Sequence, residues 1–151
     1  MKPDYDQIVT LLQKELPLIL AHQPINLAYL YGSLAQKQVT SLSDVDIALV
    51  TSQTLSPIDR LDLELKIELR LSNLGLDKAD VRVINHAPLA VQGRIVTTGV
   101  FLFGRSQASR DSFETFIRDN YQQLQPKLAQ QHQHYLQAAR HHLVTKGLYD
   151  H

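Results

Sequence analysis

Four short apolar runs limit this chain to a fold built around one small β-sheet. The runs read INLAYLYG, DVDIALVT, ADVRVIN and VFLFG, and they begin at Ile25, Asp44, Ala79 and Val100. Each is too short for a helix of useful length, and most are rich in β-branched or aromatic side chains, which favour strands. Between the runs lie longer segments whose apolar residues recur every three or four positions, the spacing of an amphipathic helix. The alternation predicts an α/β or α+β fold in which helices cover a small mixed sheet.

Helical spacing predicts four longer helices and one helical turn. They cover approximately residues 4–21, 56–73, 88–98 and 109–143, and the turn begins near Ser33. Ser56, Pro57 and Asp59 form a strong start signal, with a capping serine, a proline at the first helical position and an acid in the first turn. Proline disrupts helical hydrogen bonding, so we expect Pro17 to kink or divide the first helix and Pro126 to divide the last.

Two carboxylates stand at the beginning of the second apolar run. Residues i and i+2 of a strand project from the same face, so Asp44 and Asp46 should point together, with Cα atoms ~7 Å apart. Two like charges at a half-buried strand end are costly unless a cation lies between them. Mg²⁺ is the cation that suits oxygen ligands on rigid strands. Asp80 lies at the start of the third run in the same way, and three carboxylates would converge on two metal ions if these strands are neighbours.

Gly32 and Ser33 follow the first apolar run. A glycine at the exit of a strand lets the backbone approach a phosphate closely, and backbone N–H groups with a serine hydroxyl can bind phosphate oxygens. Taken singly, Gly-Ser is most often a turn with a helix cap, and Asp-x-Asp and Asp80 are most often surface acids. Their combination in one order along the chain is what favours a phosphate and metal site.

This combination resembles a known family. Gly32-Ser33, ten intervening residues and Asp44-Val45-Asp46 match the GSx10DxD signature of the DNA-polymerase-β-like nucleotidyltransferases. The short chain, the helix before the motif and the third-acid strand ADVRVIN resemble the minimal nucleotidyltransferase (MNT) group. The segment PLAVQGRIVTTGVFLFGRSQASRDSFETF is similar to the corresponding region of MntA-type antitoxins, which pair with HEPN-domain toxins called HepT. The resemblance covers about residues 4–116.

The resemblance implies an activity and a role for each acid. Asp44 and Asp46 would coordinate two Mg²⁺ ions, and Asp80 would complete the second metal site and help to deprotonate the acceptor hydroxyl. Gly32 and Ser33 would hold the β- and γ-phosphates of ATP. The implied reaction transfers AMP from ATP to a tyrosine hydroxyl of the HEPN toxin, which neutralises it. The chain would then be a protein adenylyltransferase and an antitoxin in a hetero-oligomer with its toxin.

Two basic residues near the motif have open roles. Many relatives carry a basic residue and then a glycine after the motif's alanine, whereas this chain has Gln36 and Lys37 after Ala35. Lys37 is therefore the candidate for the positive charge beside the nucleotide, and an ordinary exposed loop lysine is the alternative. Arg82 shares a strand face with Asp80, so it would either contact the triphosphate or pair with an acid.

Composition bears on partners and location. Fifteen basic residues balance fifteen acidic ones, which argues against a main role in coating nucleic acid or an anionic membrane. The chain has no cysteine, no signal-peptide pattern at its start and no long apolar window, so we expect a soluble, cytoplasmic protein without membrane contact.

Two other functions are compatible with the same residues. One is an antitoxin that neutralises its toxin by binding alone, with the transferase fold as a scaffold. The other is a nucleotidyltransferase that modifies a small molecule such as an antibiotic, although such enzymes usually need a further domain. After residues 1–104, expected to form the nucleotidyltransferase core, only residues 105–151 remain, and they are expected to form a C-terminal helical extension on or beside the core.

Overall fold

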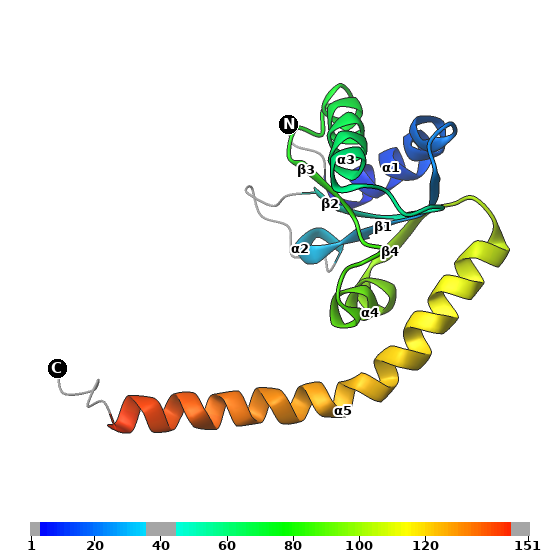
Figure 1. Cartoon of the computed structure of the whole chain (residues 1–151). Coiled ribbons are helices and arrows are strands. Elements are labelled where there is room, and N and C mark those ends of the chain that lie inside the picture. The colour runs from blue at the N-terminus through cyan, green and yellow to red at the C-terminus, as the bar shows by residue number, and fades with distance from the viewer. Residues whose placement is uncertain (1–3, 36–44, 146–151) are drawn as a thin grey trace.

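The structure, a computed structural model, describes residues 4–35 and 45–145. These residues form a four-stranded mixed sheet with helices on both faces (Figure 1). The strands are β1 (Ile25–Tyr31), β2 (Val45–Thr51), β3 (Ala79–Val83) and β4 (Val100–Gly104). The helices are α1 (Tyr5–Leu20), α2 (Gly32–Ala35), α3 (Pro57–Ser72), α4 (Leu89–Thr98) and α5 (Gln107–Thr145). The predicted fold class is confirmed.

The sheet has the strand order β3-β2-β1-β4. β1 pairs antiparallel with β2 and with β4, while β2 pairs parallel with β3. Because parallel strands need a crossover, α3 connects β2 to β3 across one face of the sheet. The condition set by the sequence, that the strands beginning near Asp44 and Asp80 are neighbours, is therefore met, and the start of β2 lies beside the start of β3.

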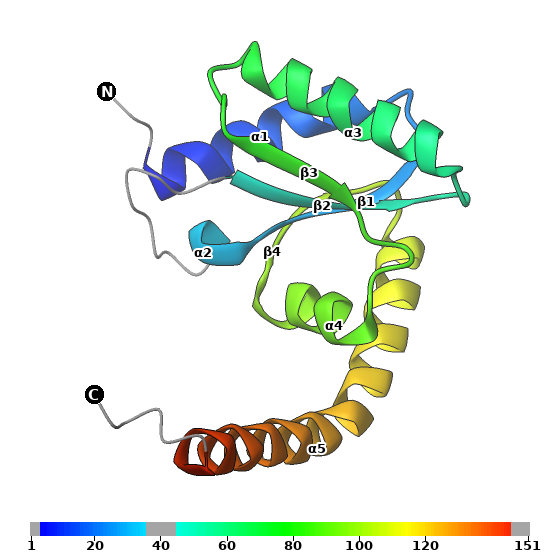
Figure 2. The same ribbon diagram turned by 60° about the vertical axis from the view of Figure 1, so that its left-hand side comes forward.

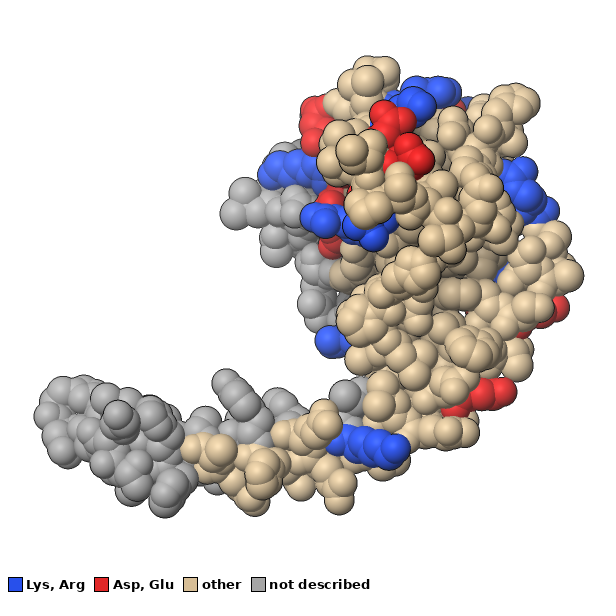
Figure 3. Space-filling model, viewed as in Figure 1, with Lys and Arg blue, Asp and Glu red and all other residues tan. Residues whose placement is uncertain are grey.

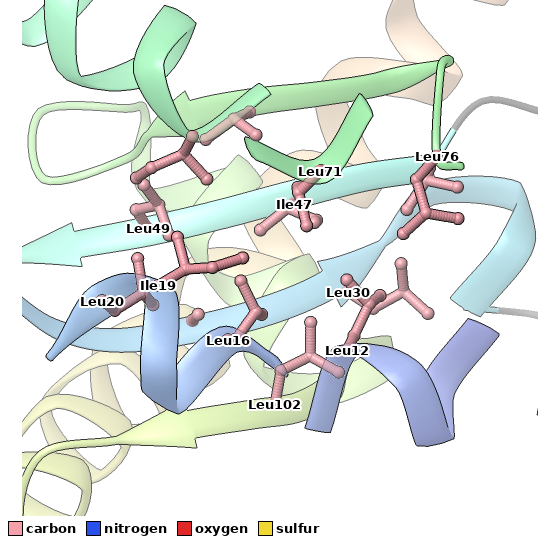
Figure 4. Packing of buried hydrophobic residues seen from close by; sticks show 14 of the residues in the cluster. Leu12, Leu16, Ile19, Leu20, Leu30, Ile47, Leu49, Leu71, Leu76 and Leu102 are labelled. Atoms are coloured by element: carbon pink, nitrogen blue, oxygen red, sulfur yellow. The ribbon is translucent and has the colours of Figure 1, made fainter. Parts of the chain in front are cut away.

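α1 and α3 cover one face of the sheet, where the larger core lies (Figure 2). Leu12, Leu16 and Leu20 of α1 are fully buried against Leu30 of β1 and Ile47 of β2 (Figure 4). Their spacing of four residues along α1 places them on one side of the helix. Side chains of β1 and β2 that point to this face of the sheet supply the other half of the core, as the sequence pattern predicts.

α4 and the first part of α5 cover the opposite face (Figure 2). Leu27, Tyr29, Ala48 and Val50 point toward them, and Ile95 of α4 completes this smaller core. The face is less completely filled with apolar groups than the other, because the same side of β2 and β3 also carries charged residues near the strand starts.

The β3 edge of the sheet is covered by carboxylates of α3. Glu68 accepts a hydrogen bond from the backbone N–H of Val81 at 3.0 Å, and Glu64 accepts one from Val83 at 2.8 Å. These two glutamates are four residues apart, so they lie on one side of α3. They satisfy N–H groups that an edge strand otherwise leaves without a strand partner.

The first part of α5 packs on the core. Tyr29 donates a hydrogen bond of 2.6 Å to the buried carboxylate of Glu114, which also pairs with Arg110 and Arg118 of the same helix. Gly93 of α4 lies so close to the ring of Tyr121 that no side chain would fit between them. Beyond this region the helix runs away from the core (Figures 1 and 2).

Neither helical proline divides its helix. Pro17 lies inside α1, and Pro126 lies inside α5, whose helix continues to Thr145. The prediction that Pro126 divides the last helix was wrong. A proline removes one backbone hydrogen bond, and a helix can continue past that loss if it bends. α5 is visibly curved along its length (Figure 1). In the two described ranges, no helix is both long enough and apolar enough to span a membrane.

Candidate active site

The end of β1 approaches the start of β2 without room for a side chain. Gly32 has φ of +79°, a conformation that L-residues with a side chain rarely adopt. A Cβ atom at this position would also overlap Oδ2 of Asp46. Glycine is therefore required here by the backbone and by the neighbouring carboxylate. α2 begins at Gly32, so Ser33 lies at the start of this short helix, as the sequence predicts for its backbone.

Three polar side chains form a row across the sheet beside Gly32. Tyr31 of β1 is the antiparallel partner of Asp46, and Asp46 is the parallel partner of Asp80 on β3. Directly paired residues on neighbouring strands share a face, with strands about 4.8 Å apart. All three side chains are half-buried. The row places two carboxylates and a phenol at the end of the sheet where the chain turns into α2.

Asp80 is engaged by Arg82 in this structure. The guanidinium Nε donates to Oδ1 of Asp80 at 2.9 Å, and the two side chains are 64% and 41% exposed. The hydrogen bond and the charge of Asp80 raise the pKa of Arg82 above its ordinary value. Of the two roles open to Arg82, the structure therefore contains the ion pair. At this exposure the pair is weak, because solvent screens it.

Tyr31 is a residue of this site that the sequence reasoning missed. Burial raises the pKa of its phenol above the ordinary value, and the negative charges of Asp46 and Asp80 raise it further. The phenol is therefore protonated at neutral pH and carries no charge beside the acids. In the sequence Tyr31 looked like the end of an apolar run. The available signal was its position directly before Gly32, which in an antiparallel pair brings it opposite the Asp-x-Asp strand.

The structure brings some of the predicted site residues together and says nothing of others. Gly32, Asp46 and Asp80 lie side by side, whereas Asp44 and Lys37 lie outside the described residues, so their roles stay predictions. The side chain of Ser33 is not described. Within residues 4–35 and 45–145, no group of three or more His, Cys, Asp or Glu side chains could hold a metal ion.

The residues that are described fit a magnesium-dependent site. Asp46 and Asp80 offer hard oxygen ligands from rigid neighbouring strands, the donor type that Mg²⁺ prefers. Gly32 adds a backbone surface that a phosphate can approach, because no Cβ stands in the way. The Arg82 guanidinium already supplies one positive charge to Asp80. Two carboxylates beside an open backbone are the parts needed to hold a polyphosphate and its cation.

The chain matches a protein family and a curated relative. The family model described as Polymerase beta, Nucleotidyltransferase matches residues 14–108. The chain is 31% identical over 120 residues to the protein adenylyltransferase MntA of Shewanella oneidensis, a match that covers 80% of this chain and 78% of that protein.

Two solved structures with the same fold come from toxin–antitoxin complexes. A chain of a toxin–antitoxin complex with AMP-PNP has a TM-score of 0.65 and 25% identity, over 82% of this chain and 98% of that chain. A chain from the complex of a tri-AMPylated Shewanella oneidensis HEPN toxin with its MNT antitoxin has a TM-score of 0.62 and 25% identity, over 85% of this chain and 98% of that one.

Proposed function

This chain belongs to the polymerase β nucleotidyltransferase family, and on that premise we propose that it is the antitoxin of a toxin–antitoxin pair. In this proposal it transfers AMP from ATP to a tyrosine hydroxyl of its cognate HEPN-domain toxin and thereby neutralises it. The observation that carries the proposal is the pairing of Asp46 with Asp80 on neighbouring strands beside Gly32. The relative is itself a protein adenylyltransferase, and one similar structure contains an AMPylated HEPN toxin.

The proposed chemistry is an attack on phosphorus. The tyrosine oxygen of the toxin forms a bond to the α-phosphorus of ATP, the bond from that phosphorus to the bridging oxygen breaks, and pyrophosphate leaves. Asp80 accepts the proton of the attacking hydroxyl, as a carboxylate at the site's edge can. The backbone at Gly32 and the hydroxyl of Ser33 hold the β- and γ-phosphates, with Lys37 as the proposed positive charge.

Asp44, Asp46 and Asp80 are the proposed ligands of two Mg²⁺ ions. When bound, the ions would neutralise negative charge on the triphosphate and on the acids. The ion pair between Arg82 and Asp80 must then loosen or be shared, and its exposure makes this inexpensive. Residues 1–104 are the proposed catalytic core, and residues 105–151 are a helical extension that the toxin can contact without entering the site.

The test is transfer of labelled AMP to the toxin. The purified chain, Mg²⁺ and α-labelled ATP are incubated with the HEPN-domain toxin proposed as its partner, and AMP additions to that protein are read by intact mass. We expect Asp46→Asn and Asp80→Asn to lower the transfer rate by at least about a hundredfold. Asp119→Asn, at an exposed position on α5, is the matched control and should retain the wild-type rate.

Two results would contradict the proposal in different ways. If the Asp46→Asn/Asp80→Asn double variant still protects cells from the toxin as well as wild type does, neutralisation occurs by binding alone. If no nucleotide is transferred to the toxin but a small molecule accepts AMP, the enzyme is a nucleotidyltransferase of the antibiotic-modifying kind. Mapping the acceptor after proteolysis identifies whether a tyrosine carries the AMP.

A further inference from the structure

α3 has a second apolar side that faces away from the protein. Ile58, Leu61, Leu65 and Leu69 are 78%, 54%, 55% and 65% exposed. Their spacing of three, four and four residues places them in one stripe along the helix. We call these four residues the outer stripe. Single exposed leucines are ordinary, but four in a continuous row on one helix mark an interaction surface.

The outer stripe is not a by-product of core packing. The buried side of α3 is supplied by Leu63, Ile67 and Leu71, which lie in the larger core. Glu64 and Glu68 fix the rotation of the helix through their hydrogen bonds to β3. The outer stripe therefore cannot turn toward the sheet without breaking those bonds, and it stays on the outside of the molecule.

A line of charges runs along one side of the outer stripe. Asp59, Asp62, Lys66 and Arg70 each follow one residue after a member of the stripe, so they share its spacing and lie along its flank. Reading along the helix, the flank is acidic in its first half and basic in its second half. In the space-filling view, acidic and basic side chains lie close together around uncharged surface over α3 (Figure 3).

We propose that the outer stripe is a self-association surface, on which a second copy of this chain packs its own α3 in the antiparallel direction. A two-fold axis through the middle of such a pair brings the same flank of both helices together in opposite order. Asp59 then lies opposite Arg70 of the second copy, and Asp62 lies opposite Lys66. Ile58 and Leu69 meet at each end of the apolar seam.

The charge order is the reason to choose a second copy over another partner. A flank that is acidic then basic is complementary to its own reverse, so α3 is matched to itself without any other sequence. The existing ion pair between Lys66 and Asp62, 3.3 Å long with both side chains about two-thirds exposed, is weak enough to exchange for contacts between copies.

The proposed contact is small and leaves the active site open. Four side chains and one charged flank fall short of a standard stable interface, so we expect a dissociation constant on the order of micromolar. The outer stripe lies on the outside of the layer formed by α1 and α3, whereas the row of Tyr31, Asp46 and Asp80 lies on the sheet face toward α4. Two copies joined through α3 can each still admit ATP and a protein acceptor.

The first test measures self-association of the full chain without its toxin. Sedimentation velocity over a concentration series should show a monomer–dimer equilibrium. Leu61→Gln/Leu65→Gln should weaken the dimer at least tenfold, because glutamine keeps helix propensity and removes the apolar seam. Phe116→Gln, at a residue 64% exposed on the first part of α5, is the matched control and should leave the dimer unchanged. Circular dichroism checks that each variant is folded.

A charge exchange tests the identity of the partner. In Asp59→Lys/Asp62→Lys the flank becomes wholly basic, and in Lys66→Glu/Arg70→Glu it becomes wholly acidic, so each variant alone should dimerise less than wild type. Mixed together, the two variants should form a heterodimer at least as tight as the wild-type dimer. Only α3 packed on α3 predicts this recovery.

Three results would each overturn the proposal. The chain could stay monomeric at several hundred micromolar, or Phe116→Gln could weaken the dimer as much as the stripe variants do. The stripe variants could also lose toxin binding while self-association is unchanged. The last result would assign the outer stripe to the toxin. Transfer of AMP by the stripe variants tests the proposed function separately, because the outer stripe lies on the side of α3 turned away from the sheet that carries Tyr31, Asp46 and Asp80.

Discussion

Gly32 and Asp46 are in direct contact across the end of the β1–β2 pair, and the contact leaves no room for a Cβ atom at position 32. The two residues are fourteen positions apart in the sequence and belong to the two halves of the predicted motif. The relationship explains why the motif needs glycine and aspartate together: the backbone that would receive phosphate is held against the carboxylate that would receive the cation.

Gly32→Ala should strongly slow the transfer of AMP at a modest cost in stability. The positive φ of Gly32 alone costs an alanine about 1–2 kcal/mol, while the overlap with Asp46 displaces the carboxylate. We expect the rate to fall at least about a hundredfold. Gly75→Ala is the matched control, since Gly75 has φ of +93° with open space around it and should show the stability loss without the rate loss. Equal activity of both variants would contradict the assignment.

Arg82→Gln should lower the Mg²⁺ concentration needed for half-maximal activity by a few fold. The guanidinium occupies an oxygen of Asp80 that the metal would use, so its removal frees that ligand. The effect is small because the pair is exposed. The measurement is a Mg²⁺ titration at saturating ATP, with the exposed Lys14→Gln as control. If the KM for ATP rises and the Mg²⁺ requirement does not change, Arg82 binds the triphosphate instead.

Tyr29→Phe should lower stability near neutral pH and flatten its decline in alkali. Burial, and then the hydrogen bond to Glu114, raise the pKa of Tyr29 above its ordinary value. The folded chain therefore holds this proton more tightly than the unfolded chain, so the stabilisation is complete below about pH 10 and is lost as pH rises above it. Urea denaturation from pH 8 to 11 should show wild type declining more steeply than the variant.

The size of the neutral-pH effect is set by one buried hydrogen bond, about 1–2 kcal/mol. Tyr121→Phe is the control, because phenylalanine at this position lacks the hydroxyl and keeps the ring that contacts Gly93. Parallel alkaline curves for wild type and Tyr29→Phe would show that this phenol does not couple to folding.

Gly93→Ala should destabilise the attachment of α5, although alanine is the better helix former. A Cβ at position 93 would overlap the ring of Tyr121, and overpacking of this kind costs about 1–3 kcal/mol. In Tyr121→Ala the ring is absent, so Gly93→Ala should there be neutral or stabilising by up to about 1 kcal/mol. Thermal denaturation of the four proteins in this double-mutant cycle measures the coupling, and additivity would contradict the contact.

Most of the fold could be predicted because its local signals agree. β1, β3 and β4 begin within a residue of their apolar runs, and α3 begins where Ser56 caps it and Pro57 enters it. The prediction for Pro126 failed because proline propensity describes an isolated helix. The sequence contains no simple measure of whether a long helix can bend past one lost hydrogen bond.

The residues of the candidate site could be predicted where they belong to a local sequence motif. They could not be predicted where their position depends on the pairing register between strands. Asp46 and Gly32 were recognisable by spacing, and Asp80 by analogy of position. Tyr31 was missed because its role follows from being opposite Asp46 in an antiparallel pair, which spacing does not reveal. The outer stripe was missed for a related reason: leucine occurs on both the buried and the exposed side of α3, and residue type alone does not tell the two sides apart.

The hydrogen bonds from β3 to Glu64 and Glu68 make α3 a substitute for the strand that the sheet lacks. Because α3 is held in this way, its inner and outer sides are under different constraints. Substitutions on its inner side are constrained by folding, whereas substitutions on its outer side can accumulate while the row of Tyr31, Asp46 and Asp80 stays intact.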